Sequence, residues 1–292
     1  MNKIKGRPKR IALLTDSCSD MPVDKALAKG IYVVPLRIIC GDTEYLDGVN
    51  ISNKDVYDFQ EKGKTLKTSL PSGNSVINTL NRIAADGYDG VIAVMLSSGL
   101  SGTYNFVKKL AEERNDILIE VFDSKNASLG LAMILIQLAE DIKNGADWNE
   151  LIDSRVPYLI ENTFSFFSVD TLEYLHKGGR IGYITAVAGT LLNVKPIIKF
   201  SDDGKLETAA KVRGNAQMID KLYELVCKKY DSHTKFNLAV ANGGMPQEMK
   251  KLKRKLVLTL PKYSKIQQGE IGGTLSVYIG KGMLGAAIQI LE

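Results

Sequence analysis

Short apolar runs alternate with helical patterns through the first half of the chain. Four runs have the length and continuity of buried strands, at residues 10–15, 31–39, 90–96 and 117–122. Three other segments place apolar residues at helical spacing, at residues 72–85, 101–114 and 126–143. Because strands separated by helices pair in parallel, this pattern predicts a mainly parallel sheet flanked by helices on both faces.

The pattern changes after a further helix expected at residues 148–160. Beyond it, strands are expected at residues 195–200, 205–211, 235–241 and 276–279, and helices at residues 215–229 and 246–258. We therefore expect two α/β domains, an N-terminal one over residues 1–160 and a C-terminal one over residues 161–292. The sequence shows no repeat and no low-complexity linker between them, so close contact between the domains is expected.

Composition places the chain among proteins that bury a sizeable core. It has 292 residues, of which 45% are hydrophobic and 24% charged. Its longest apolar stretch, residues 129–138, is well short of the ~20 residues of a membrane-spanning helix. No signal-peptide pattern follows the basic N-terminus. The three cysteines, Cys18, Cys40 and Cys227, favour a reducing compartment, so a cytoplasmic location is expected.

The net charge of +5 is concentrated in two basic segments, residues 3–10 and 250–255. The first contains Gly6-Arg7-Pro8, which is similar to the core of an AT-hook that binds the DNA minor groove. A solvated tail before the first strand is the alternative, and one short motif does not outweigh it. The second segment fits the wet face of an amphipathic helix. Nucleic-acid binding is thus an alternative and not the expected function.

The sequence offers little for catalysis. Its only histidines, His176 and His233, have no metal-ligand spacing with a cysteine, an acid or each other. It contains no phosphate-binding GxxxxGK[ST] loop, no GxGxxG fingerprint after the first strand and no GxSxG nucleophile elbow. We expect no metal and no cofactor.

A hydroxyl-rich loop at residues 97–103 joins a predicted buried strand to a predicted helix. It contains Ser97, Ser98, Ser101 and Thr103 with two glycines. In a parallel sheet this loop lies at the carboxyl ends of the strands, where ligands bind, and a helix N-terminus favours an anion. Simple capping of the helix by Ser98 or Ser101 is the other interpretation.

A second loop, residues 67–72, has a related composition. Pro71 favours a turn, and Ser72 is placed to cap the helix that follows. Thr68 and Ser69 come just before the turn. Taken alone, this segment reads as a loop and a helix cap.

Together these segments resemble the DegV family of bacterial fatty acid-binding proteins. The matching motifs cover nearly the whole chain in family order, and SSGLSGTY with YLxKGGRI is the most specific pair. They lie at residues 15–17, 67–72, 96–104, 123–125, 170–181, 195–197, 203–204, 211–213 and 280–282.

The resemblance implies a fatty acid buried between two domains, with its carboxylate held by polar side chains. The matching positions are Thr68, Ser101 and Arg213. The family's fourth position is a histidine, which is Tyr278 here, with Lys281 close behind it. Possible supporting residues in the two loops are Ser69, Ser98 and Gly102. Arg180, beside two glycines, is interpreted as a brace between the domains.

The expected function is therefore to bind a long-chain fatty acid, for transport or for presentation to a separate fatty acid kinase, without catalysis by this chain. An acyl hydrolase using Ser101 is the enzymatic alternative, although it needs a base beside the nucleophile. Candidates for the tunnel wall lie on one strongly apolar helix, and each is equally compatible with an ordinary core. They are Leu129, Met133, Ile134 and Ile136.

Overall fold

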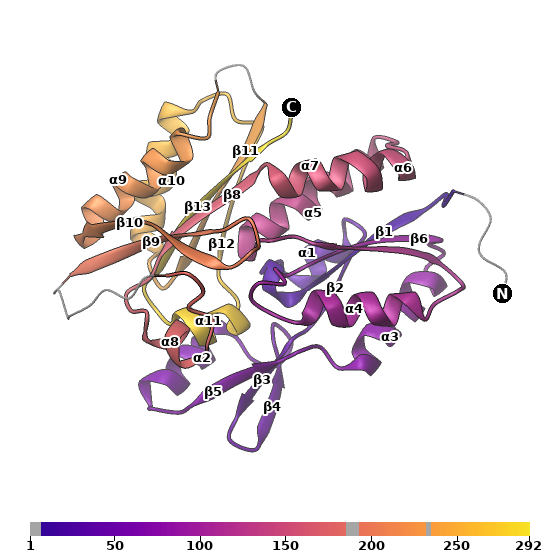
Figure 1. The fold of residues 1–292 in the computed structure, drawn as a ribbon, viewed down its shortest axis with the longest axis horizontal. Coiled ribbons are helices and arrows are strands. Elements are labelled where there is room, and N and C mark those ends of the chain that lie inside the picture. Colours follow the sequence, from indigo (N-terminus) through magenta and orange to yellow (C-terminus); the bar gives the residue numbers. More distant parts are fainter. Residues whose placement is uncertain (1–6, 185–192, 232–234) are drawn as a thin grey trace.

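The computed structural model describes residues 7–184, 193–231 and 235–292, and its chain forms three sheets (Figure 1). The first is a four-stranded parallel sheet in the order β2-β1-β6-β7. Its strands are Ile31–Val34, Ile11–Asp16, Gly90–Met95 and Leu118–Asp123. Every residue of β6 is buried, as expected for the centre of a sheet covered on both sides. The predicted parallel sheet is confirmed.

Helices cover both faces of this sheet. One face packs against α3 and α4 through an apolar cluster that includes Leu80, Ile83 and Val107. The opposite face packs against α1, α5 and the helical segment α6-η2-α7 through Leu13, Ile92 and their neighbours. The bounds are α1 Val23–Leu27, α3 Gly73–Ala85, α4 Thr103–Glu112, α5 Ser128–Lys143, α6 Trp148–Glu150, η2 Leu151–Arg155 and α7 Val156–Glu161; the short η1 is Ser17–Ser19.

The strand expected over residues 31–39 is in fact two strands in two different sheets. The chain leaves the parallel sheet after β2, and Pro35, which has no backbone N–H, stands at the break. The chain then forms β3, the central strand of a small antiparallel sheet in the order β4-β3-β5. Helix α2 contacts β5 of this sheet. Their bounds are β3 Arg37–Cys40, β4 Thr43–Leu46, β5 Leu66–Ser69 and α2 Asn53–Glu61.

The C-terminal half builds a six-stranded mixed sheet in the order β10-β9-β8-β13-β11-β12. Helices α9 and α10 cover one face through a large apolar cluster. The short α8, Glu173–Lys177, follows β8. The other bounds are β8 Thr163–Ser168, β9 Val194–Phe200, β10 Leu206–Arg213, β11 Phe236–Gly243, β12 Lys265–Glu270, β13 Met283–Ile290, α9 Gly214–Cys227 and α10 Pro246–Thr259.

The strand expected at residues 276–279 is wrong, because that segment belongs to helix α11, Gly273–Ile279. Its alternating apolar residues Leu275, Val277 and Ile279 resemble a strand in sequence. In the structure the helix packs against α2 and α8. Gln60 of α2 donates hydrogen bonds to the carbonyls of Ser276 and Val277. Contacts from distant parts of the chain thus overrule the local pattern.

Helix α5 lies between the two large sheets, which explains why its sequence is apolar nearly all round. Leu131, Ile134 and Leu135 join the core of the parallel sheet, whereas Leu129 and Met133 join a cluster on the inner face of the six-stranded sheet. All strands of the first two sheets end before residue 124, and those of the third begin at Thr163. The domain division at residue 160 remains a prediction that agrees with this arrangement.

Candidate functional site

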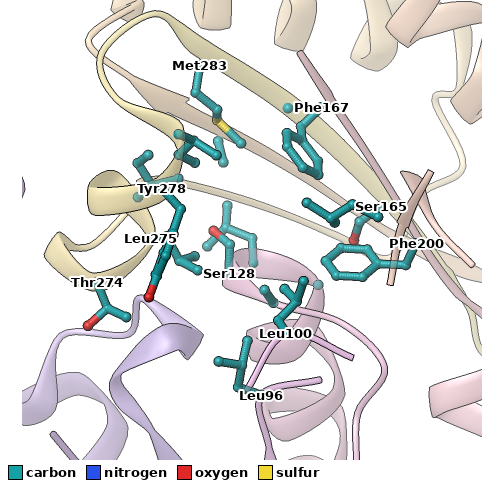
Figure 2. A pocket seen from close by; sticks show the side chains of 18 of the residues that line it. Leu96, Leu100, Ser128, Ser165, Phe167, Phe200, Thr274, Leu275, Tyr278 and Met283 are labelled. Atoms are coloured by element: carbon teal, nitrogen blue, oxygen red, sulfur yellow. The ribbon is translucent and has the colours of Figure 1, made fainter. Parts of the chain in front are cut away.

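A cavity lies between the two halves of the chain. Side chains from the parallel-sheet half, such as Leu96 and Leu100, face others from the six-stranded half, such as Phe167 and Met283 (Figure 2). Most of the lining is apolar. A mainly apolar lining with a few polar groups is typical of small-molecule sites.

Four structural elements shape the apolar part of this cavity. The loop after β6 contributes Leu96 and Leu100, and the start of α5 contributes Leu129. The inner face of the six-stranded sheet contributes mostly small residues, including Ala241. Helix α11 adds Leu275 from the side of the small sheet (Figure 2). Together these elements surround a space that apolar atoms can fill.

Polar side chains gather on one part of the lining, where β5 and α11 meet. Thr68 Oγ1 and Tyr278 Oη lie 2.5 Å apart, so one hydroxyl donates to the other. The Arg180 guanidinium carbon lies 5.2 Å from the centre of the Tyr278 ring, in cation–π contact. The structure therefore brings together Thr68 and Tyr278, both expected as site residues, and adds Arg180 beside them.

Arg180 also connects the two halves of the chain. Its Nε donates to the carbonyl of Leu100 at 3.2 Å, and its Nη1 donates to the carbonyl of Gly178 at 2.7 Å. The first contact agrees with the interpretation of Arg180 as a brace. Because Arg180 also lines the cavity, the bracing role describes only part of its position.

Ser101 lines the same cavity, just before α4 begins. Its Oγ lies 2.9 Å from Thr103 Oγ1 and accepts the Thr103 backbone N–H at 3.3 Å. Gly102 is the N-cap residue of α4, and it is exposed and not among the described residues that line the cavity. The position of Ser101 is thus compatible with both helix capping and ligand contact.

Ser69 and Ser98, expected as supporting residues, do not line the cavity in the described structure. Ser69 Oγ accepts a hydrogen bond from Arg37 at 2.9 Å. Ser98 donates both its N–H and its hydroxyl to the carboxylate of Asp123. Both serines are therefore used to hold their loops in shape.

Arg213 is also outside the cavity as the structure describes it. Leu206 at the start of β10 lines the cavity, but Arg213 ends that strand, seven residues or roughly 20 Å further along. The arginine is exposed, and its backbone N–H donates to Gln217 Oε1 at the start of α9. The expected role of Arg213 stays a prediction, and the structure places this residue at the exposed end of β10.

Of the tunnel-wall candidates on α5, only Leu129 lines the cavity among the residues described. Met133 is buried in the surrounding apolar cluster, and Ile134 faces the parallel sheet instead. Ile136 is half-buried and lies outside the lining. Met133 and Ile134 are thus buried core residues, as the alternative interpretation expected.

Three carboxylates behind the cavity were not predicted as functional. Asp16 accepts the backbone N–H groups of Cys18 and Leu96, and thereby fixes the start of the hydroxyl-rich loop. Burial raises its pKa to about 6, although those two N–H groups act in the opposite direction. The sequence signal was Thr15-Asp16-Ser17 after the first strand, which carried no role before the fold was known.

The other two, Asp20 and Asp47, hold the start of α11. Asp20 accepts the N–H of Gly272 and the hydroxyl of Ser128, a cavity-lining residue. Asp47 accepts the N–H of Gly273 and the hydroxyl of Ser17. Burial raises the pKa of both carboxyl groups. These contacts tie the cavity-lining helix of the C-terminal half to the N-terminal half.

The described residues contain no group of three or more His, Cys, Asp or Glu side chains placed to hold a metal ion. His176 is exposed on α8, and His233 lies outside the described residues. In the same part of the chain, no helix is long and apolar enough to cross a membrane. Of the basic arm, residues 1–6 lie outside the structure as described, whereas Arg7 forms an ion pair with Asp147.

Comparison with known proteins gives a consistent result over the full length. The family model DegV, described as an uncharacterised protein family, matches residues 10–290. A DegV domain-containing protein from Clostridium acetobutylicum is 38% identical over 279 residues, covering 96% of this chain and 98% of the relative. One from Clostridium perfringens is 35% identical over 280 residues, again covering 96% and 98%.

Solved structures show the same fold. A fatty acid-binding DegV family protein from Thermus thermophilus has a TM-score of 0.89 and 28% identity, covering 97% of this chain and all of that one. DegV from Bacillus subtilis, a fatty acid binding protein, has a TM-score of 0.86 and 26% identity, covering 96% and 99%. With the cavity, the shared architecture and these matches in view, the chain belongs to the DegV family.

Proposed function

We propose that this chain binds a long-chain fatty acid, with the acyl tail in the apolar cavity and the carboxylate at its polar part. The observation that carries the proposal is the cavity itself, which is mainly apolar and has Thr68, Ser101, Arg180 and Tyr278 among its lining residues. A fatty acid has this same division between one charged end and a long apolar body. Two solved relatives described as fatty acid-binding support the proposal.

The two parts of the ligand contribute differently to affinity. Burial of each methylene group gains about 0.8 kcal/mol. A hydrogen bond to a charged group contributes about 1.5–3 kcal/mol. A long tail therefore supplies most of the binding free energy, while the hydroxyl groups of Thr68, Ser101 and Tyr278 set the position of the head group.

In this proposal Arg180 takes the place that the family resemblance assigned to Arg213. Arg180 lines the cavity and lies over the Tyr278 ring, so its positive charge is adjacent to the proposed carboxylate position. The charge of Arg213 is held at the far end of β10. Arginine also presents a planar set of donors that matches a carboxylate.

The finer part of the proposal is that the bound carboxylate is presented to a separate fatty acid kinase. Arg180 is exposed as well as cavity-lining, which supports access to the polar part of the cavity from the surface. Phosphoryl transfer requires such access in line with the phosphate. A histidine at position 278 can carry a positive charge near neutral pH, whereas Tyr278 offers a hydroxyl group.

Tyr278→His tests this finer part. Because a histidine ring can also donate a hydrogen bond to the carboxylate, fatty acid binding should change little, while acyl-phosphate formation with a compatible kinase should rise. If wild type supports phosphorylation as well as the histidine variant does, position 278 does not control transfer.

Binding without catalysis agrees with the surroundings of Ser101. Its hydroxyl contacts Thr103, and neither His176 nor another described histidine lines the cavity. A hydrolase would require a base hydrogen-bonded to the nucleophile. An ester-cleavage assay with Ser101→Ala as control distinguishes the two functions.

Titration of delipidated protein with a fluorescent long-chain fatty acid tests the binding proposal. We expect saturable binding of one molecule per chain, displaced by unlabelled fatty acid. The matched control is Ala241→Phe, which fills the apolar part of the cavity without touching a polar residue and should lower affinity. Equal affinity of both folded proteins would place the ligand elsewhere.

A further inference from the structure

The inner face of the six-stranded sheet is arranged in rows that run across its strands. The strand register aligns Phe167, Gly285 and Ala241 in one row. Two residues further along each strand, Ser165, Ala287 and Ala239 form the next. All of these residues line the cavity. Side chains two apart lie on the same face of a strand, so the cavity extends over both rows.

The third row on this face contains only polar side chains. It consists of Thr163, Gln289 and Asn237, which the same register aligns. The three side chains are 5%, 0% and 3% exposed, and none of them lines the cavity. The apolar cavity therefore ends at the boundary between a row of small residues and a row of buried polar ones.

Hydrogen bonds hold this third row together and attach it to α5. Asn237 Nδ2 donates to Gln289 Oε1 at 3.2 Å and to Gln137 Oε1 of α5 at 3.3 Å. Gln289 Nε2 donates to Thr163 Oγ1 at 3.0 Å, and that hydroxyl donates to the carbonyl of Leu159. These four side chains form a polar group that joins the six-stranded sheet to α5. The group lies directly beyond the second row of cavity-lining residues.

Helix α5 shows the same transition along its own length. Leu129 and Gly130 in its first turn line the cavity. Gln137, two turns later, is 9% exposed and belongs to the polar group. Its Nε2 donates to Asp141, which forms an ion pair with Arg155. The polar group is therefore held by hydrogen bonds to α5 on one side and across the strands of the sheet on the other.

We propose that Thr163, Asn237, Gln289 and Gln137 form the end wall of the acyl tunnel and set the longest chain that the protein accepts. This inference rests on the proposed fatty acid-binding function and adds a specificity determinant to it.

A terminal methyl group cannot replace the contacts that this wall makes. Pushing between Asn237 and its partners would leave buried amide groups unpaired, and that penalty exceeds the gain from one more buried methylene. Asn237 Oδ1 lacks a donor among the described residues, and a methyl group cannot supply one. An apolar wall of flexible side chains, by contrast, yields to a longer ligand.

Affinity for a series of saturated acids, from dodecanoic to docosanoic, tests the wall in wild type. We expect a gain of about fourfold per added methylene up to a limiting length, followed by a loss of at least about tenfold. A steady gain in affinity across the whole series would overturn the proposal that these residues end the tunnel. Failure to bind any of these acids would overturn the binding proposal and this inference with it.

Two variants test whether the polar group sets the longest acyl chain that the protein accepts. The triple variant Gln137→Leu/Asn237→Ala/Gln289→Ala removes the three amides of the polar group together. Thr163 keeps its hydrogen bond to the Leu159 carbonyl and Asp141 keeps its ion pair with Arg155. The variant should move the limit by about two or more carbons to longer acids. Ala239→Leu fills the preceding row and should move it to shorter acids.

Melting curves check that both variants are folded. An unchanged limit in a folded triple variant would contradict the assignment. If that variant does not fold, the wild-type series and Ala239→Leu still decide, because an unchanged limit in Ala239→Leu would show that the tail ends elsewhere.

Discussion

Thr68 Oγ1 on β5 and Tyr278 Oη on α11 lie 2.5 Å apart, although 210 positions separate them in the sequence. One hydroxyl comes from the N-terminal half and the other from the C-terminal half, and both line the cavity. A single carboxylate can accept from both, because each hydroxyl can turn its proton away from the other. Closure of the two halves thus creates the polar part of the site.

The first prediction concerns this pair. Thr68→Val and Tyr278→Phe keep the shape of each side chain and remove its hydroxyl. Each should weaken fatty acid binding by about 1–3 kcal/mol, roughly five- to 150-fold. Isothermal titration of delipidated protein measures the loss. Affinities equal to wild type in both variants would remove the pair from the head-group site.

The second prediction distinguishes two arginines. Arg180→Gln should lower affinity by on the order of tenfold, because the guanidinium beside Tyr278 is the positive charge that lies in the cavity lining. Arg213→Gln is the matched control, since that arginine is exposed at the far end of β10. The opposite order of effects would support the role that the family resemblance implied for Arg213.

The third prediction separates the two roles of Ser101. If its hydroxyl binds the carboxylate, Ser101→Ala lowers affinity by about 1–3 kcal/mol. If it only caps α4 by accepting the Thr103 N–H, the same change lowers the melting temperature of the ligand-free protein. Gly102 already occupies the N-cap position, so we expect the larger effect on affinity. A lower melting temperature with unchanged affinity would assign Ser101 to the helix alone.

The fourth prediction follows from Asp16. Burial raises its pKa from 3.8 to about 6, so the folded protein binds this proton more tightly than the unfolded chain does. Its contribution to the free energy of unfolding is therefore greatest below pH ~4 and is lost as pH rises through ~6. Over this window the loss approaches about 3 kcal/mol.

Chemical denaturation at several pH values compares wild type with Asp16→Asn. The variant is expected to be less stable throughout, because an amide cannot accept from both Cys18 and Leu96. The informative quantity is the slope, and the fall in stability between pH 4 and 6 should be smaller in the variant. Parallel curves would show that Asp16 does not titrate in this range.

The parallel sheet was predictable because its signal is local. Strand β6 is buried throughout, and helices α3, α4 and α5 were expected within two residues of their observed bounds. Helix α11 was not predictable in this way. Its conformation depends on Asp20 and Asp47, more than 200 positions earlier in the chain, and periodicity cannot report such contacts.

The site was predictable in part for a similar reason. Ser101 stands between a strand and a helix that a pattern can place, whereas Thr68 was expected from the family resemblance, and the fold brings both to the cavity. The distance between Arg213 and the cavity depends on how β10 runs across the second sheet, which no motif records. The polar third row became visible only with the register that aligns Thr163, Gln289 and Asn237.

The most direct test of the account is mass spectrometry of lipid extracted from the protein after purification from a bacterial host. We predict the release of a long-chain fatty acid in an amount close to one molecule per chain. Protein that releases no fatty acid, and that after delipidation also takes up none from solution, would contradict the account.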